Sequence, residues 1–329
     1  MTLRVATDIG GTFTDLVAFD ERSGALTVGK APTTPTELPR GVIDAVAAGG
    51  VSLAEASELV HGTTVVINAL TERRGARTAL VTTKGFRDVL EIGRGNRPDM
   101  YNLVSRKPPP FVPRRHRFEV RERVDRSGVV LRPLEVADLE PVVEACRRNG
   151  IEAIAVCLLH SYAHPAHEQA ARDALRAALP DVPVTISSEI TREWREYERS
   201  STAVLNAYVQ PAVERYLDAL AERLQQEGLA VPVGIVQSNG GTASLAAART
   251  RPVRLVESGP AAGVIGAARL GERIGEGNVL YLDIGGTTAK CSLIEDGQPK
   301  TANRYTYAVQ SSSGPVFALR NGMVASTSP

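Results

Sequence analysis

The pentapeptide Asp-Ile-Gly-Gly-Thr occurs twice, at 8–12 and at 283–287, and this repeat constrains the fold more than any other feature of the chain. Each copy follows one apolar stretch and precedes another, in "ATDIGGTFTDLVAFD" (6–20) and "YLDIGGTTAKCSLIED" (281–296). We therefore predict two β-hairpins that turn through their glycine pairs. A single Gly-rich turn is common, whereas two identical turns in the same context indicate a shared task.

The chemistry of such a turn favours an anionic ligand. Adjacent glycines let main-chain N–H groups approach an anion closely, and threonine hydroxyls add further donors. A carboxylate at the end of the preceding strand can hold a hydrated Mg²⁺ ion against phosphate groups. We therefore expect Asp8 and Asp283 to be catalytic residues and to bind Mg²⁺ through water. The residues expected to bind the phosphates are Gly10, Gly11, Thr12, Thr14, Gly285, Gly286, Thr287 and Thr288.

Two such hairpins facing each other predict a clamp around the phosphates of a nucleotide, with ATP as the expected cofactor. The chain contains no Walker sequence G-x-x-x-x-G-K-[ST], so the clamp is not a P-loop. The alternative, that each copy is only a hairpin turn, fits one copy well and two copies poorly.

Strands and helices alternate along the chain, which is typical of an α/β protein. "RVATDIG" (4–10), "DLVAFD" (15–20) and "ALTVGKA" (25–31) predict three strands in series. Helix and strand units follow, including a buried strand within 151–159 and a long helix over about 198–228. This order resembles a ribonuclease-H-like sheet.

The Ala/Gly-rich segment "ESGPAAGVIGAARL" (257–270) comes shortly before the second hairpin. A helix of small residues at this place makes the chain resemble the superfamily of actin, sugar kinases and heat-shock ATPases. The resemblance implies a helix that connects two lobes, whose small residues permit a close crossing at a hinge. Ordinary core packing explains the same composition equally well.

Nine segments together resemble the hydantoinase A and 5-oxoprolinase family, which also contains the ATP-using subunits of acetone and acetophenone carboxylases. They span about residues 3–300 in the family's order: "DIGGTFTD", "HGTTVVINAL", "EIGRGNRPDMYNL", "VPRRHRFEVRERVD", "LLHSYAHPAHE", "SSEITREWREYERSSTAVLNAYVQP", "QSNGG", "ESGPAAG" and "DIGGTTAK". The resemblance implies ATP- and Mg²⁺-dependent hydrolysis of a cyclic amide of the hydantoin or 5-oxoproline type, activated by phosphorylation of its carbonyl oxygen. It also implies a hydantoinase B-type subunit as partner.

The same resemblance implies an N-terminal hydantoinase/oxoprolinase domain at 1–190, the start of a hydantoinase A domain at 191–300, and a divergent tail at 301–329. The tail is rich in Ser and Gly, and we expect part of it to be disordered. Members of the family continue well past the second hairpin. We therefore expect a truncated chain with an incomplete second lobe and weak ATP binding, and the missing part of that lobe as a further partner.

The segment "HGTT" (61–64) coincides with a motif of the family. A strand is expected to meet a helix here, so the threonines can bind an anion or cap the helix. We expect His61 to be catalytic and Thr63 to bind the cofactor. A buried, hydrogen-bonded histidine with a helix cap is the alternative.

Two arginines in the Gly/Pro loop "GRGNRPD" (93–99) are weaker candidates for substrate binding. Arg94 and Arg97 can reach a carboxylate or a phosphate with paired donors. A loop that is merely exposed explains them as well.

His160, His164 and His167 have a spacing that would suit a zinc ion on one helical face. Pro165 interrupts this pattern and favours a loop that leads into a helix. The sequence leaves metal binding by this cluster open.

Composition excludes several classes of partner. The net charge is +1, and the basic stretch "RRHRFEVRERVDR" (114–126) alternates with acidic residues and has few aromatics, unlike a nucleic-acid groove. No apolar run approaches the roughly 18 residues that cross a bilayer, and no export signal is visible. Three widely spaced cysteines favour a reducing compartment. We expect a cytoplasmic protein that binds neither nucleic acid nor membrane.

Three other functions stay open beside the cyclic amidohydrolase. The first is the ATP-binding subunit of a ketone carboxylase. The second is a sugar kinase, some of which begin with the same pentapeptide but usually carry a Cys-rich zinc motif that this chain lacks. The third is an inactive or non-enzymatic ATP-binding partner.

Overall fold

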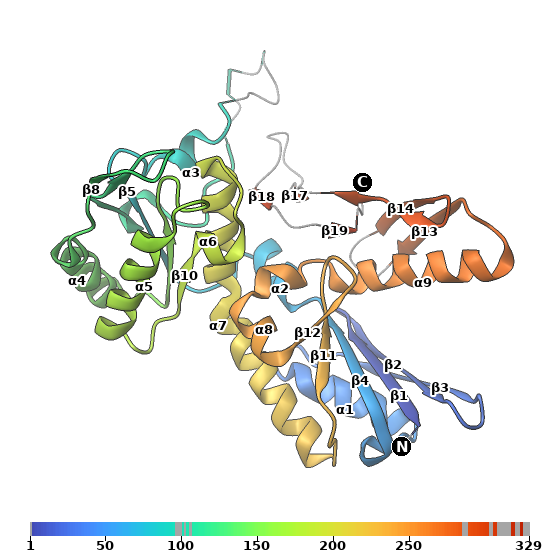
Figure 1. Cartoon of the computed structure of the whole chain (residues 1–329). Coiled ribbons are helices and arrows are strands. Elements are labelled where there is room, and N and C mark those ends of the chain that lie inside the picture. Colours follow the sequence, from blue (N-terminus) through green and yellow to red (C-terminus); the bar gives the residue numbers. More distant parts are fainter. Residues whose placement is uncertain are drawn as a thin grey trace. The chain divides into compact units, whose positions relative to one another are not determined.

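The computed structural model describes residues 2–95, 101, 103–104, 107–284, 289–302, 305–307, 317–319 and 323–324. The chain folds into two compact units (Figure 1). Unit 1 comprises Met1–Asn68, Val213–Asn303 and Asn321–Pro329, and unit 2 comprises Ala69–Ala212 and Arg304–Arg320. Each unit draws on separate stretches of the sequence, so the division into 1–190, 191–300 and 301–329 stays a prediction about domain families.

Unit 1 contains a six-stranded mixed sheet in the order β12–β11–β4–β1–β2–β3. Its strands are β1 (Leu3–Ile9), β2 (Phe13–Asp20), β3 (Leu26–Pro32), β4 (Ala56–Thr63), β11 (Val233–Val236) and β12 (Thr242–Ser244). β2 is antiparallel to β1 and β3, whereas β1, β4 and β11 are parallel. The three predicted N-terminal strands and their ribonuclease-H-like order are confirmed.

Alternating burial along β1 decides which side chains reach the candidate site. Val5, Thr7 and Ile9 are buried, while Asp8 lies on the accessible face, because successive side chains of a strand point to opposite faces. Helix α1 (Leu38–Ala48) covers the buried face. The second half of α7 (Glu196–Gln226) reaches the same face through Tyr216, which bonds His61 of β4, and carries four more buried residues: Val213, Leu217, Leu220 and Leu224.

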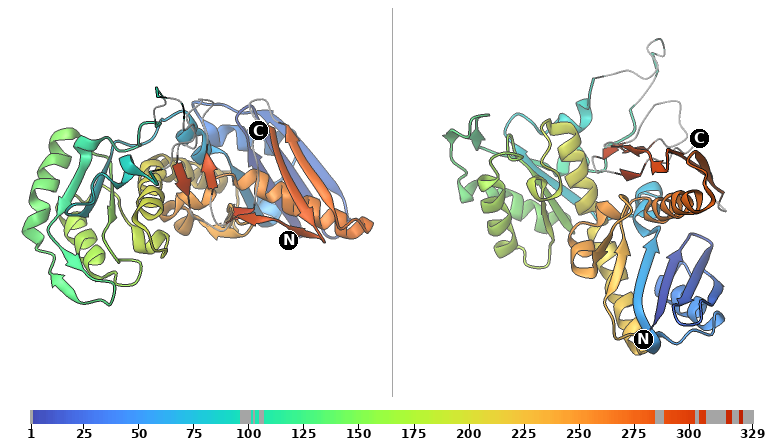
Figure 2. Two further views of the ribbon diagram at one scale, coloured as in Figure 1. Left: turned by 90° about the horizontal axis from the view of Figure 1, so that it is seen from above. Right: turned by 45° about the vertical axis from the view of Figure 1, so that its right-hand side comes forward.

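The second predicted hairpin is also confirmed in unit 1. β13 (Val279–Ile284) and β14 (Ala289–Glu295) are antiparallel, and β15 (Gln298–Pro299) extends this sheet. Helix α9 (Ser258–Ile274) lies along the hairpin (Figures 1 and 2). A Cβ at Gly263 would come 2.1 Å from the Tyr281 hydroxyl, so close packing against β13 explains the glycine at this position of α9.

Unit 2 contains a parallel sheet in the order β10–β9–β5–β6. Its strands are β5 (Thr78–Thr83), β6 (Arg117–Val120), β9 (Ala153–Cys157) and β10 (Val184–Ile186), and its helices include α4 (Glu140–Asn149) and α5 (Ala166–Ala178). Every residue of β5 and β9 is buried, as is typical of strands covered on both faces. β6 was not predicted, because its stretch of sequence is rich in Pro and Arg.

The remaining described elements are short: α2 (Val65–Thr71), α3 (Val89–Ile92), α6 (Ser187–Ile190), α8 (Leu245–Thr250), β7 (Arg123–Val124), β8 (Val130–Arg132), β16 (Thr301–Ala302), β17 (Tyr305–Tyr307), β18 (Phe317–Leu319) and β19 (Met323–Val324). The rest of the divergent tail lies outside the described residues. Among the helices that the structure describes, none is long and apolar enough to cross a membrane.

Candidate functional site

The first hairpin forms a tight turn held by its own backbone and by Thr33. The Gly10 N–H donates to the Phe13 carbonyl at 2.9 Å and closes the turn. Thr33 donates through its hydroxyl to the Gly10 carbonyl and through its N–H to the Thr12 carbonyl, both at 2.9 Å. Gly11 and Thr12 remain exposed at the tip, where their N–H groups are accessible to a ligand.

Thr14 lies on the other side of this hairpin. Its side chain is fully buried, and its hydroxyl lies 3.1 Å from that of Thr33. The phosphate-binding role expected of Thr14 is therefore corrected: Thr14 supports the turn from the core, because its place in β2 points it away from the open face.

Asp8 stands at the end of β1 against two glycines. A Cβ at Gly62 of β4 would lie 2.4 Å from Asp8 Oδ1, and one at Gly259 of α9 would lie 3.1 Å from the same atom. A Cβ at position 62 would therefore displace the carboxylate, and one at position 259 would make a tight contact with it. Both glycines lie within motifs of the sequence, but their role follows only from their contact with Asp8, which comes from a distant segment.

Asp283 of β13 comes within electrostatic reach of Asp8. The pKa of Asp8 is raised, first because nearby protein atoms reduce its hydration, although the residue keeps accessible surface, and then by the charges of Asp15 and Asp283. Lys290 acts in the opposite direction. The two carboxylates of the repeated pentapeptide therefore lie close enough for the charge of one to act on the other.

These oxygen donors fit a hydrated Mg²⁺ ion. A divalent cation offsets the repulsion between neighbouring carboxylates, and Mg²⁺ commonly keeps several waters and binds one or two carboxylates. Among the described residues, no group of three or more His, Cys, Asp or Glu side chains could hold a metal directly. Gly285, Gly286, Thr287 and Thr288, expected to bind phosphate, lie outside the described residues.

His61 is a core residue, which corrects its expected catalytic role. It is fully buried; Nδ1 lies 2.7 Å from the Thr7 hydroxyl and Nε2 lies 2.6 Å from the Tyr216 hydroxyl. Burial lowers the pKa of His61 to about 4, so the ring is neutral at pH 7. Both ring nitrogens are engaged, and neither is available to a ligand.

Thr63 is likewise structural. Its side chain is buried, and its hydroxyl accepts a hydrogen bond from the Val65 N–H at 3.2 Å, which caps the start of α2. Its main-chain N–H and carbonyl both bond the hydroxyl of Ser258, the first residue of α9. The alternative of a buried histidine with a helix cap is the one that this geometry favours.

Arg94 of unit 2 is already paired. Its Nε donates to Glu198 Oε1 at 2.6 Å, its Nη2 donates to the other carboxylate oxygen, and the Glu198 side chain is almost completely buried. Arg97 lies outside the described residues. Substrate binding by these arginines stays a prediction.

The histidine cluster of unit 2 does not converge. His167 Nδ1 bonds a buried carboxylate, Glu122 Oε2, at 2.7 Å. His160 sits at a left-handed φ of 56°, and His164 lies against Gly128. Pro165 precedes α5 as its N-terminal flank, as the loop interpretation predicts.

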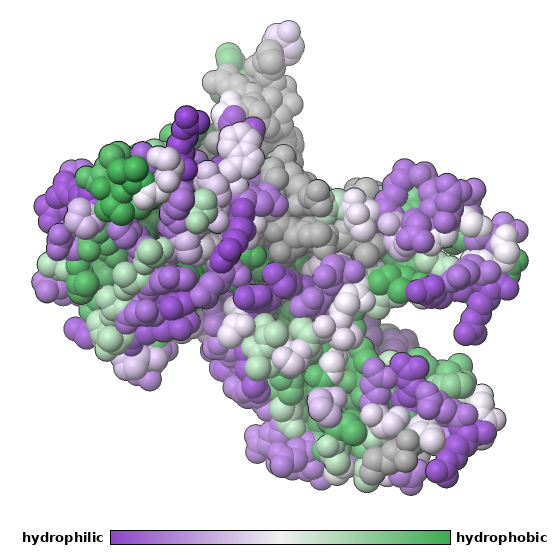
Figure 3. Space-filling model, viewed as in Figure 1, coloured by the Kyte–Doolittle hydropathy of each residue, from purple (hydrophilic) through white to green (hydrophobic). Residues whose placement is uncertain are grey.

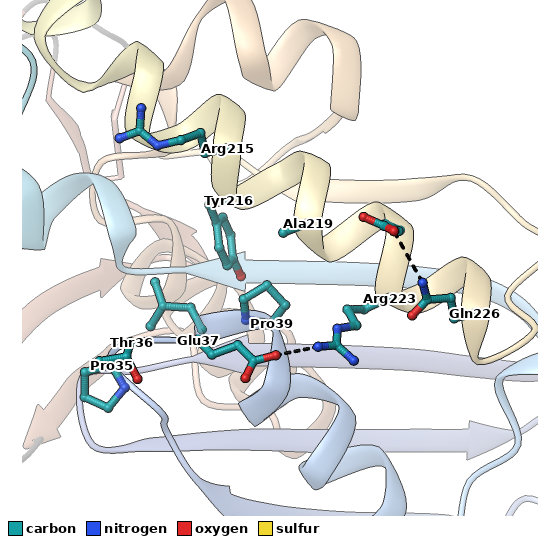
Figure 4. A pocket seen from close by; sticks show the side chains of 11 residues that line it. Pro35, Thr36, Glu37, Pro39, Arg215, Tyr216, Ala219, Arg223 and Gln226 are labelled. Atoms are coloured by element: carbon teal, nitrogen blue, oxygen red, sulfur yellow. Dashed lines mark hydrogen bonds and ion pairs between the residues drawn. The ribbon is translucent and has the colours of Figure 1, made fainter.

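A cavity of about 860 Å³ in unit 1 lies between the residues that lead into α1 and the second half of α7 (Figure 4). Its charged side chains are partly paired with each other: Arg223 donates to Glu37 at 2.6 Å. Tyr216 lines the cavity but directs its hydroxyl to His61. The cavity therefore borders the buried face of the sheet, whereas Asp8 lies on the opposite face.

Two family descriptions match the chain: the hydantoinase/oxoprolinase N-terminal region over residues 4–179 and hydantoinase/oxoprolinase over residues 199–323. An uncharacterized protein of Methanocaldococcus jannaschii is 41% identical, over 93% of this chain and 45% of that protein. The acetophenone carboxylase gamma subunit of Aromatoleum aromaticum is 34% identical, over 91% and 43%. Caprolactamase subunit alpha of Pseudomonas jessenii is 34% identical, over 90% and 44%. The chain spans less than half the length of these relatives.

Solved structures give the same result. One match is the nucleotide-free structure of acetone carboxylase, an enzyme of ATP-dependent acetone carboxylation. The TM-score is 0.86 at 29% identity, over 100% of this chain and 48% of that chain. The ATP-dependent caprolactamase from Pseudomonas jessenii matches with a TM-score of 0.85 at 31% identity, over 99% and 47%. By sequence and by fold, the chain belongs to the hydantoinase/oxoprolinase family.

Proposed function

We propose that this chain carries the ATP-binding site of an enzyme that hydrolyses a cyclic amide of the hydantoin or 5-oxoproline type. The observation that carries the proposal is that α9 contacts both Asp-Ile-Gly-Gly-Thr hairpins: Gly259 lies against the Asp8 carboxylate and Gly263 lies against Tyr281 of β13. The charge of Asp283 also acts on Asp8. A caprolactamase subunit among the relatives supports a cyclic amide as the substrate class.

In this proposal the chain positions phosphates and neutralises their charge. Asp8 and Asp283 hold Mg²⁺ through water, and the exposed N–H groups of Gly11 and Thr12 donate to phosphate oxygens. Gly62 and Gly259 have no Cβ that would crowd the carboxylate of Asp8. Catalysis of phosphoryl transfer rests mainly on such positioning, so a general base at His61 is not required.

Bound ATP would supply a phosphoryl group to the amide oxygen of the ring. Amide resonance protects an unstrained lactam from water. Phosphorylation of the oxygen removes that resonance and creates a leaving group. The proposal therefore explains why ring hydrolysis should need the two phosphate hairpins.

A ketone carboxylase is the second candidate, and a specific observation favours it. The acetophenone carboxylase gamma subunit and the caprolactamase subunit are each 34% identical to this chain. A ketone reacting through its enol also presents a carbonyl-type oxygen to the phosphoryl group. The same hairpins would serve both reactions, so the difference between them lies with the substrate.

A partner is part of the proposal, because relatives are named as subunits. The second hairpin exposes apolar side chains: Leu280, Leu282, Ile284 and Leu293 are 63%, 57%, 73% and 48% accessible. The face of α9, β13 and β14 that Figure 3 turns to the viewer is mostly hydrophilic, in purple. We propose that a hydantoinase B-type subunit, or residues equivalent to the remaining half of the relatives, covers the exposed apolar side chains.

The test is ADP release by the chain co-purified with a B-type subunit. Hydantoin, 5-oxoproline and caprolactam are compared with acetophenone plus bicarbonate and with glucose. Stimulation by a cyclic amide is the expected result, and stimulation by the ketone alone selects the second candidate. Stimulation by glucose alone would contradict both.

A further inference from the structure

Three consecutive residues at the start of α9 join the elements of the candidate site. Glu257 pairs with Lys290 of β14 in a buried ion pair. Ser258 bonds the main chain of Thr63 at the end of β4. Gly259 lies against the carboxylate of Asp8 at the end of β1. This tripeptide therefore ties the second hairpin to the strand ends that carry the first.

Glu257 has an unusual backbone for its residue type. Its φ of 59° and ψ of 32° lie in the left-handed region, which residues with a Cβ seldom adopt. Such a conformation persists where surrounding contacts hold it, and such residues cluster at functional sites. Here Glu257 forms a buried ion pair with Lys290.

Lys290 occupies the same position in its hairpin as Asp15 in the first. Asp8 faces Asp15 in the register of β1 and β2, and Asp283 faces Lys290 in the register of β13 and β14. Asp15 carries its own partner, because Lys30 lies 2.6 Å away. The exchange of Asp for Lys at this register position gives the second hairpin a cation where the first has an anion.

Lys290 lies beside the two carboxylates of the candidate site. Lys290 faces Asp283 across the second hairpin, and its partner Glu257 is two residues from Gly259, which lies against the Asp8 carboxylate. A phosphate chain entering beside Asp8 and Asp283 would meet repulsion from both carboxylates. An ammonium group has three donors, so Lys290 can keep one hydrogen bond to Glu257 and give another to a phosphate.

We propose that Lys290 binds a phosphate group of the ligand between the two hairpins and that Glu257 is the positioning residue that holds it there. The inference rests on the proposed function for the nature of the ligand. It assigns to the second hairpin a side-chain contact that lies beyond its Gly-Gly-Thr turn.

The experiment compares the affinity for MgADP and for Mg-tripolyphosphate by titration calorimetry. Lys290→Met should weaken both by about 10-fold or more, as expected for loss of one charge-assisted hydrogen bond. Lys290→Arg should recover part of the affinity. Because Lys290→Met leaves Glu257 buried without its partner, the double variant Glu257→Gln/Lys290→Met removes both charges and guards against misfolding.

The double variant separates the two roles. If Lys290 binds phosphate, the double variant stays as weak as Lys290→Met, although its melting temperature returns toward that of the wild type. If the double variant binds like the wild type, Lys290 only neutralises Glu257 and the inference is overturned. Lys300→Met and Glu295→Gln alter an exposed pair, 2.8 Å apart, beside the same strand and serve as controls.

The experiments distinguish a failure of the proposed function from a failure of the inference about Lys290. A wild-type chain that binds tripolyphosphate through Lys290, yet shows no ATP turnover with any cyclic amide or ketone, supports the inference and contradicts the function. A wild-type chain that binds neither phosphate compound overturns both.

Discussion

The two copies of one pentapeptide stand in different surroundings. Ile9 of the first copy is 1% accessible, whereas the equivalent Ile284 of the second is 73% accessible. β1 lies inside a six-stranded sheet between β2 and β4, while β13 is the edge of a three-stranded sheet. The same local sequence therefore joins two antiparallel strands on two unequal supports.

The difference teaches where each hairpin obtains its stability. The first is supported from the core by the hydrogen bonds of Thr7, His61 and Tyr216 and by Thr33 at its turn. The second is connected to the strand ends chiefly through α9 and the pair of Lys290 with Glu257. Four predictions test this contrast, from the largest expected effect to the smallest.

The isoleucines of the two pentapeptides form a matched pair. Ile9→Ala should lower the free energy of unfolding by about 2–5 kcal/mol, because it leaves a cavity in the core. Ile284→Ala should change it by less than about 0.5 kcal/mol, because the side chain is already exposed. Urea unfolding of both variants measures the difference. Equal losses would show that the second hairpin is as well supported as the first.

The buried histidine should make stability depend on pH. Its pKa is about 4 in the folded chain and about 6.5 when unfolded, so the unfolded chain binds more protons between these values. Stability should therefore fall as the pH drops from 6.5 toward 4, by about 3 kcal/mol from this residue. His61→Gln should be less stable at pH 7.5 and should show a correspondingly smaller loss on acidification. Parallel pH profiles would contradict the neutral, buried state of His61.

Gly62 should be required for ligand binding rather than for the turn. Gly62→Ala places a methyl group 2.4 Å from Asp8 Oδ1 and should displace the carboxylate. We expect Mg²⁺-dependent nucleotide affinity to fall about 10-fold, equivalent to about 1.4 kcal/mol. Gly234→Ala, whose added atom would meet neighbours no closer than 3.6 Å, is the control in the same sheet. An unchanged affinity for the nucleotide would show that the position of the Asp8 carboxylate does not affect ligand binding.

Thr33 should have the smallest of the four effects. Thr33→Val removes the hydroxyl that donates to the Gly10 carbonyl and should cost about 1 kcal/mol of stability. Thr27→Val, in β3 of the same sheet, controls for the change of residue type. A loss no larger than that of the control would mean that the turn holds without this bond.

The sequence predicted what local pattern and chemistry determine. Alternating apolar residues gave the strands of both hairpins, and the repeated Asp8 and Asp283 indicated a common site. The errors concern residues whose environment comes from distant segments. His61 is buried because Tyr216, on α7, meets its ring, and Thr14 faces inward because α1 covers its side of the sheet. The sequence gives no role to Lys290 of β14, because its partner Glu257 lies far away in the sequence, just before α9.

The central claim is that the two hairpins form one site, and a double-mutant cycle on Asp8 and Asp283 tests it most directly. The dissociation constant of MgATP is measured for the wild type, Asp8→Asn, Asp283→Asn and the double variant. If both carboxylates hold the same ion, each single change should weaken binding and the double change should add little, with a coupling energy above about 1 kcal/mol. Effects that add within about 0.5 kcal/mol, or an effect of one carboxylate alone, would contradict a shared site.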